Sequence, residues 1–397
     1  MTPSILPIPK AIFRGSLTLA ALALLGGTVL AQDVKSYVYV ENNAGKTEGT
    51  NSVFGFVNDG SGNLTALPSS PYLTGGTGVF DPGGGSTEFD AEQEVIANSA
   101  GTLLYAVNGH SNTIAGFSIG ADGTLAPLPG SPYASGGQDP ASIGILPTKG
   151  LVVVVNKNED PNQDISADLP NYTTFTQNAD GSLALNSAST QDLTVDCSPA
   201  QALVRSRGHL LFGLEFKAAR LVSYRLNLNG TLTELSSISP PTADDVFLGE
   251  VHHPSRRIIY VGLPGTSQVG VYKYTVGGVL SLVGTVPNEG NAICWLAMNS
   301  AGTRLYTAET EGGSISVYDT SVATSPVMLQ RIILSGTIGT VSNIALDPAG
   351  NFLYALAGHT VHTVNIQADG TMTETVAPVV FSGAGNEKPL GLAVVRK

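Results

Sequence analysis

The 397-residue sequence is poor in residue types whose scarcity excludes whole classes of protein. It has two cysteines and only 13% charged residues, 19 basic and 31 acidic. Two cysteines exclude a small domain held together by several disulfides. A net charge of −12, with no run of Lys and Arg to offset it, excludes the electrostatic pattern of a nucleic-acid-binding protein. So few charges also argue against a coiled coil or long helical bundle.

Glycine, in contrast, is abundant: there are 47 glycines in a chain that is 42% hydrophobic. Such a hydrophobic fraction is typical of a packed core and not of a disordered chain. Frequent glycine beside threonine, serine and valine favours short strands joined by tight turns. The composition therefore predicts an all-β protein, either as two or three ordinary domains or as one large closed domain.

The N-terminus has the three parts of a secretory signal peptide. Lys10 and Arg14 precede an apolar run at 16–30, and a small residue follows at Ala31. The run is shorter than a membrane-spanning helix needs. We expect cleavage after Ala31, which leaves residues 32–397 as a mature chain that is secreted or periplasmic. No later run is long enough to span a bilayer, so we expect no membrane span in that chain.

One hairpin recurs along the sequence. It reads NSAGTLLYAVN at 98–108, NSAGTRLYTAE at 299–309 and DPAGNFLYALA at 347–357. Runs that alternate apolar and polar residues follow, such as ISVY at 315–318, which is the pattern of a half-buried strand. Asp-Gly or Asn-Gly pairs come next, as in DGTL at 122–125, and they supply the backbone angles of a tight antiparallel turn. Each repeat therefore predicts a small antiparallel sheet of four strands.

Seven such repeats fit the chain, with a second strand roughly every 50 residues. The seven strand centres are Tyr39, Tyr105, Val154, Phe212, Tyr260, Tyr306 and Tyr354. Two longer gaps contain insertions at 68–93 and 158–171. A repeat of this size cannot bury both faces of its sheet alone, so the repeats must pack against one another. Radial packing closes them into a propeller.

The two ends of the mature chain indicate how the ring closes. It begins with a second strand at 37–40 and finishes with an unpaired apolar strand at 390–395. Pairing these two edges leaves neither exposed. We therefore predict one seven-bladed β-propeller, with four antiparallel strands per blade and the C-terminal strand completing the first blade. Cys197 and Cys294 would begin the inner strands of blades four and six, which are too far apart for a disulfide, so we expect both thiols to be free.

These motifs resemble the seven-bladed propeller lactonases, a family that includes bacterial 6-phosphogluconolactonase and carboxy-muconate cyclising enzymes. The resemblance rests on the hairpin at 347–357, the Asp-Gly-Thr-Leu turns and the seven repeats, and it covers residues 34–397. It implies a hydrolase that opens a sugar-type lactone at the channel mouth. The histidines that enter blade three and the Arg-His pair that enters blade four in catalytic relatives have no match in this sequence. Only Glu215, after the second strand of blade four, matches the family's strand-end glutamate.

Polar residues recur at the ends of the second strands, which meet on one rim of a propeller. They are Glu41, Asn108, Asn156, Glu215 and Glu309. One interpretation is that they seal the blade junctions by hydrogen bonds to neighbouring loops. The other is that they form a site for a polar ligand at the channel mouth. The spacing identifies no metal site and no cofactor, although these oxygens leave open the binding of a divalent cation.

Histidine and tryptophan supply the remaining candidates. His110 and His359 each follow a glycine just after a second strand, so they are either helpers of Glu215 on that rim or exposed loop residues. Trp295, on the inner strand of blade six, is either an aromatic floor for a sugar or lactone ring or a core residue. No HExxH, paired CxxC or GxSxG motif occurs, which leaves a zinc protease, a zinc ribbon and a hydrolase elbow without their defining residues.

Two functional hypotheses follow. The first is an exported lactonase-type hydrolase in which Glu215 is the acid/base group and His110 or His359 assists. The second is a non-catalytic exported propeller that serves as a rigid platform for a ligand or a protein. The expected partner is a small lactone or sugar-like molecule, nucleic acid is not expected, and the expected state is a monomer.

Overall fold

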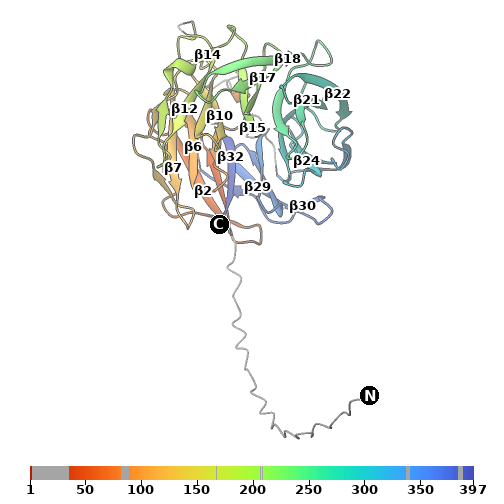
Figure 1. Ribbon diagram of the computed structural model, residues 1–397. Coiled ribbons are helices and arrows are strands. Elements are labelled where there is room, and N and C mark those ends of the chain that lie inside the picture. Colours follow the sequence, from red (N-terminus) through yellow and green to blue (C-terminus); the bar gives the residue numbers. More distant parts are fainter. Residues whose placement is uncertain are drawn as a thin grey trace. The chain divides into compact units, whose positions relative to one another are not determined.

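Seven antiparallel sheets, one for each sequence repeat, make up the structure (Figure 1). It is a computed structural model that describes Met1 and residues 35–81, 89–166, 168–205, 207, 209–336, 340–382 and 388–397. The predicted signal peptide, apart from Met1, lies outside the described residues. Within the described part of the chain, no helix is long and apolar enough to cross a membrane. The prediction of an all-β, seven-bladed propeller is confirmed.

Each blade has four strands, which are numbered in chain order, and each series of equivalent strands runs from blade one to blade seven. The inner strands are β32 (Leu390–Arg396), β5 (Val95–Ala97), β10 (Pro140–Leu146), β15 (Pro199–Arg205), β19 (Leu248–His252), β23 (Ile293–Met298) and β27 (Val341–Leu346). The second strands are β1 (Ser36–Glu41), β6 (Leu103–Asn108), β11 (Leu151–Asn156), β16 (Leu210–Glu215), β20 (Ile258–Leu263), β24 (Arg304–Glu309) and β28 (Phe352–Ala357). The third strands are β2 (Ser52–Asn58), β7 (Thr113–Ile119), β12 (Asn171–Gln177), β17 (Arg220–Leu226), β21 (Gln268–Tyr274), β25 (Ser314–Asp319) and β29 (Thr360–Ile366).

The outer strands complete the blades. They are β3 (Leu64–Ala66), β8 (Leu125–Pro127), β13 (Leu183–Leu185), β18 (Leu232–Ile238), β22 (Leu280–Pro287), β26 (Val327–Ile333) and β30 (Met372–Glu374). Four short strands pair with third strands, namely β4 (Tyr72–Leu73), β9 (Tyr133–Ala134), β14 (Gln191–Asp192) and β31 (Val379–Val380). A 3₁₀ turn, η2 (Ser187–Ser189), lies in blade three.

The C-terminal strand closes the ring as predicted. β32 pairs with β1 in antiparallel register, from Arg396 opposite Ser36 to Leu390 opposite Glu41. Blade one therefore takes its inner strand from the last residues of the chain, so neither edge is left unpaired. Both cysteines are buried and free, which confirms the expectation from their positions.

The second strands form the centre of the hydrophobic core. All six residues of β11 and of β16 are buried, because neighbouring blades cover both faces of each sheet. Their sequences, LVVVVN and LLFGLE, are accordingly apolar almost throughout and do not alternate. The outer strands have one face in solvent, and β22 alternates accordingly between exposed and partly buried residues along most of its length.

Tyrosines at the centres of the second strands tie each blade to the next one. In four blades the hydroxyl group donates a hydrogen bond to a main-chain carbonyl in the outer turn of the following blade. The pairs are Tyr39 with Gly123, Tyr105 with Gly181, Tyr260 with Ala323 and Tyr306 with Gly370. The residue type that marks the repeats in the sequence is thus the one that joins the blades.

Removing one of these hydroxyl groups should weaken the fold measurably. Tyr39→Phe should lower the free energy of unfolding by about 1 kcal/mol, because the buried carbonyl of Gly123 loses its donor at 2.6 Å while the ring packing remains. Urea denaturation measures the effect. The matched control is Tyr133→Phe, whose hydroxyl group bonds to Pro129 within an exposed turn and should matter little. Equal stability of Tyr39→Phe and the wild type would contradict this role.

Candidate functional site

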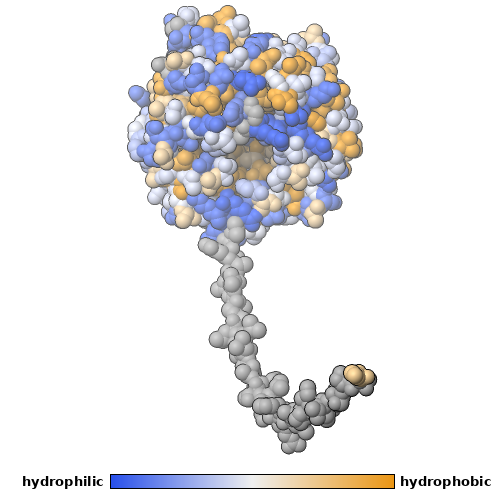
Figure 2. Space-filling model, in the orientation of Figure 1, coloured by the Kyte–Doolittle hydropathy of each residue, from blue (hydrophilic) through white to orange (hydrophobic). Residues whose placement is uncertain are grey.

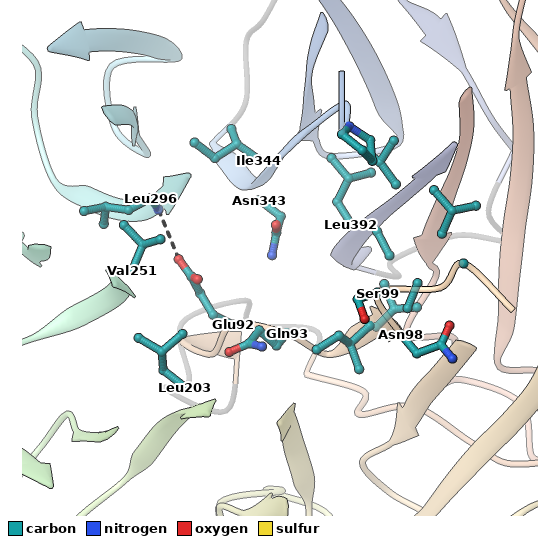
Figure 3. Close-up of a pocket in the computed structure, with 18 of the residues that line it drawn as sticks. Glu92, Gln93, Asn98, Ser99, Leu203, Val251, Leu296, Asn343, Ile344 and Leu392 are labelled. Atoms are coloured by element: carbon teal, nitrogen blue, oxygen red, sulfur yellow. Dashed lines mark hydrogen bonds between the residues drawn. The ribbon is translucent and has the colours of Figure 1, made fainter. Parts of the chain in front are cut away.

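The inner strands of six blades enclose a central cavity of about 590 Å³. Its walls are largely aliphatic, with Leu203, Val251, Leu296, Ile344 and Leu392 contributed by five different blades (Figure 3). Figure 2 shows one face of the propeller, which is hollowed near its centre and has apolar side chains in the hollow. A cavity of this size is within the range of small-ligand sites, roughly 300 to 1,000 Å³.

One end of the cavity is crossed by a short segment, residues 89–94, which we call the crossing segment. Glu92 N donates to the carbonyl of Ala200 in blade four at 3.0 Å. On the other side, the indole N–H of Trp295 in blade six donates to the carbonyl of Ala91 at 3.2 Å. Bonds to blades four and six show that the segment spans the channel. It does so at the rim where the second strands end, since it leads directly into β5.

A β-bulge aims one side chain from each of several inner strands toward this end of the channel. The register shifts at the second residue of β10, β15, β19, β23 and β27. Bulges commonly redirect a side chain near a functional site. The residues that follow the bulge are Ser142, Gln201, Glu250, Trp295 and Asn343, of which Gln201, Glu250 and Asn343 line the cavity.

Three carboxyl groups are buried at the crossed end. Glu92 and Glu250 line the cavity, and Glu94 lies beside Asn343, whose Nδ2 is 3.4 Å from its Oε2. Burial raises the pKa of all three well above the usual carboxyl range. The charge of Glu92 raises the pKa of Glu94 and of Glu250 further. Burial therefore favours the protonated form of each of these groups.

Three buried carboxyl oxygens at this end have no hydrogen-bond partner within the described part of the chain. Both side-chain oxygens of Glu250 and Oε1 of Glu94 are buried without a hydrogen bond. In contrast, Glu92 Oε1 accepts from the main-chain N–H of Leu296 at 3.2 Å, as Figure 3 shows. Since buried polar groups are normally paired, the open oxygens indicate a place for a ligand.

The polar side chains that line the crossed end of the cavity are acids and amides, while Lys157, outside the lining, donates to the carbonyl of Asp90 in the crossing segment at 2.6 Å. Gln201 Nε2 donates to Gln93 Oε1 at 3.0 Å, so neutral amides surround the carboxyl groups. Among the described residues that line the cavity, Arg396 is the only cation, and it lies toward the opposite rim. No cluster of three or more metal-ligating side chains occurs in the described ranges. The site can donate and accept hydrogen bonds and can exchange protons.

The rim residues predicted from the sequence lie elsewhere. Glu41, Asn108 and Asn156 are buried at the ends of their second strands, on one rim as expected, but they do not line the cavity. Asn51 Nδ2 donates to Glu41 Oε1 at 2.7 Å and to Asn108 Oδ1 at 2.9 Å, which joins blades one and two. These contacts have the form of the junction seal that the sequence left open.

Glu215 and Glu309 are similarly enclosed within their own blades. Glu215 Oε2 accepts from Arg220 at 2.8 Å, and Glu309 Oε2 accepts from Ser314 at 2.7 Å. Burial raises the pKa of Glu215, although Arg220 opposes that shift. The structure therefore does not bring Glu215, Glu309 and Asn108 together around the cavity.

Glycines in the repeated connectors explain why these rim side chains are covered. A Cβ atom on Gly76 would lie 2.5 Å from Asn108 Cγ, and one on Gly137 would lie 2.7 Å from Asn156 Cβ. The connector must pass directly over the amide, which only glycine permits. The asparagines thus account for the second glycine of the Gly-Gly pair that ends each connector, 67–76 and 128–137, whereas the first, Gly75 or Gly136, adopts a positive φ of 76° or 84°.

The remaining candidates also lie outside the cavity. His110 Nδ1 is 2.6 Å from Asp160 Oδ2 in a loop pair, and the His359 ring stacks edge-on near Phe381 at 5.7 Å. Trp295 is buried and supports the crossing segment instead of lining the cavity. The catalytic roles of Glu215, His110 and His359 stay predictions.

Comparison with solved structures shows the same fold in several lactonase-type proteins. A 6-phosphogluconolactonase candidate from Bacteroides uniformis is 15% identical, with a TM-score of 0.69, and covers 92% of this chain and 100% of its own. A periplasmic gluconolactonase from Pseudomonas aeruginosa is 14% identical, with a TM-score of 0.68 over 91% of this chain and 99% of its own. A 6-phosphogluconolactonase candidate from Bacteroides fragilis is 14% identical, with a TM-score of 0.67 over 92% of this chain and 99% of its own.

In the comparisons of sequence, no protein-family profile and no curated protein matches the chain. The structural matches are low in identity but extend over nearly the whole of each partner. The chain is therefore a seven-bladed propeller with the fold of the lactonase-type propellers, as the sequence resemblance implied.

Proposed function

We propose that the protein binds a small, uncharged, hydroxyl-rich lactone in the central cavity and hydrolyses it there. The observation that supports this most is the pair of buried carboxyls, Glu92 and Glu250, that line the crossed end of a largely aliphatic cavity, with Glu94 buried nearby and the pKa of all three raised by burial. A protonated carboxyl and an amide both donate and accept hydrogen bonds, which suits a ligand rich in hydroxyl groups. The fold shared with lactonase-type propellers supports the reaction class.

The carboxyl groups can divide acid and base work between them. Because their pKa values are coupled, one carboxyl ionises while its neighbour keeps its proton over an interval of pH. The ionised carboxylate takes a proton from the attacking water, and the oxygen of that water bonds to the lactone carbonyl carbon. The protonated carboxyl then gives its proton to the ring oxygen as the ring C–O bond breaks. The product is an open hydroxy acid.

We also propose that the protein acts outside the cytoplasm. Residues 1–31 have the pattern of a signal peptide, and one protein of the same fold is a periplasmic gluconolactonase.

A non-catalytic platform is the second candidate function. It is favoured by the lack of a cation among the described residues that line the crossed end of the cavity, where the polar ones are Glu92, Gln93, Gln201, Glu250 and Asn343. The lining would offer an oxyanion only amide and carboxyl donors, which stabilise it less than a guanidinium group does.

Hydrolysis of gluconolactone and other aldonolactones by the purified protein, followed in a pH-stat, tests the proposal. We expect turnover above the uncatalysed rate, and calorimetry should show binding of the same compounds. Binding without turnover would support the platform instead. Neither binding nor turnover with any neutral lactone would overturn the proposed function.

A further inference from the structure

A second cavity, of about 300 Å³, lies between the turns of blades four and five, and four arginines line it. Arg205 is the last residue of β15, Arg207 lies in the turn that follows it, and Arg256 and Arg257 come from the turn between β19 and β20. We call this cavity the arginine pocket. It contains four of the ten arginines of a chain whose net charge is −12. The sequence shows no such cluster, because the two turns become neighbours only when adjacent blades pack.

Nothing in the lining balances this charge. The other described residues around the pocket are apolar, aromatic or hydroxyl-bearing, and no described ion pair joins any of the four arginines to a carboxylate. Burial lowers the pKa of Arg205, and the charges of Arg207 and Arg257 lower it further. Burial and then Arg205 lower the pKa of His252 as well.

One guanidinium group of the pocket is held in place from several sides. Arg205 is only 6% exposed, and its Nη1 donates to the carbonyl of Arg256 at 3.0 Å. Its Cζ atom lies 5.3 Å from the centre of the Tyr274 ring, a cation–π contact. A guanidinium fixed in this way presents its remaining N–H groups without a large loss of side-chain entropy.

Tyr274 provides an independent indication of a ligand. It lines the pocket and is 5% exposed, and its hydroxyl oxygen is buried without a hydrogen-bond partner among the described residues. A buried hydroxyl group without a partner is unusual in a native fold. An oxyanion in the pocket would accept from the hydroxyl group and from the arginines together.

We propose that the arginine pocket binds a phosphate group. Guanidinium groups form paired, charge-assisted hydrogen bonds with phosphate oxygens. A doubly charged phosphate matches several uncompensated arginines better than a single carboxylate does. The site lies on the rim opposite the crossing segment and is independent of the proposed lactone hydrolysis. The phosphate could belong to a soluble phosphate ester or to a lipid headgroup, because Val276, also in the lining, is 70% exposed.

Calorimetric titration of the purified protein with inorganic phosphate tests the proposal at constant ionic strength set with chloride. We expect saturable binding that the double variant Arg207→Gln/Arg257→Gln weakens by roughly tenfold or more. Both of those side chains are exposed, so the fold should survive, and thermal denaturation checks this. The control is Arg225→Gln on β17, an exposed arginine outside the pocket with the same change of charge per substitution.

Vesicles distinguish the two sources of phosphate. One outcome is that the protein sediments with vesicles that contain phosphatidate and not with vesicles of phosphatidylcholine alone. If the double variant abolishes that sedimentation, the pocket is assigned to a lipid headgroup. Binding of inorganic phosphate without sedimentation would assign it to a soluble ester. No binding in either arm, or an equal loss in Arg225→Gln, would overturn the proposal. Lactone hydrolysis should be unaffected by the double variant, so this result and the test of the proposed function are separable.

Discussion

Glu250→Gln should lower kcat/KM for lactone hydrolysis by roughly 100-fold or more, which is the usual effect of removing a general acid or base. The substitution keeps the shape of the side chain and removes only its ability to exchange a proton. Neither oxygen of Glu250 has a hydrogen-bond partner in the described structure, so no protein contact is lost. The fold should therefore remain intact, which distinguishes a loss of chemistry from a loss of structure. Glu92→Gln should behave similarly.

Two further variants serve as a control for this experiment and as a test of the alternative site. Glu48→Gln removes an exposed carboxyl and should leave kcat/KM within about twofold of the wild type. Glu215→Gln tests the residue predicted from the sequence. If Glu215→Gln abolished turnover while Glu250→Gln retained it, the rim would be the active site and the cavity proposal would be wrong. Denaturation must accompany the Glu215 variant, because that change also breaks the ion pair with Arg220.

The free energy of unfolding should fall as the pH rises from about 5 to about 8. Burial raises the pKa of Glu41 to about 8 and that of Asp139 to about 7, and it raises those of Glu92, Glu94 and Glu250 well above the usual range. In the unfolded chain these carboxyls lose their protons near pH 4. Between the two pKa values the folded protein therefore binds more protons than the unfolded chain does.

The sign follows from linkage. Stability from a group with a raised folded pKa is fully present below its unfolded pKa and is lost as the pH rises through the folded pKa. Each unit of pKa difference corresponds to about 1.4 kcal/mol, so Glu41 and Asp139 alone should cost several kcal/mol. Exposed carboxyls with lowered pKa, such as Asp122 and Asp180, act in the opposite direction only below about pH 4.

Denaturation in urea at intervals from pH 5 to pH 8 measures this slope. Glu250→Gln should have a shallower slope than the wild type, since one of the titrating groups is gone. Glu48→Gln should keep the wild-type slope. Stability that rose between pH 5 and pH 8 would show that the buried carboxyls are paired in a way the structure does not contain.

Periodicity in the sequence was sufficient to predict the blades and the closure of the ring. Tyrosine, glycine and Asp-Gly pairs recur because each repeat solves the same packing problem, as the bond from Tyr39 to Gly123 shows. The prediction that both cysteines are free followed from their positions in blades that are not neighbours. Repetition also placed Asn108 and Glu215 correctly on one rim, but it contained no information on the Gly76 backbone above Asn108 or on the Arg220 beside Glu215.

The cavity residues were missed for a different reason. Glu92 lies in an insertion that has no counterpart in the other blades, so no comparison between repeats could show that it turns inward. Glu250 had a usable signal, because Gln201 and Asn343 occupy the same position after the bulge in their own inner strands. When the inner strands are aligned with one another, the polar residues in these otherwise apolar strands indicate the positions that face the channel.

A crystal structure of the protein with a bound aldonolactone, or with the corresponding hydroxy acid, tests the central claim most directly. We expect the ligand in the central cavity, with its oxygens within hydrogen-bond distance of Glu92 and Glu250. A ligand bound instead on the rim beside Glu215 or His110, with the cavity empty, would contradict it.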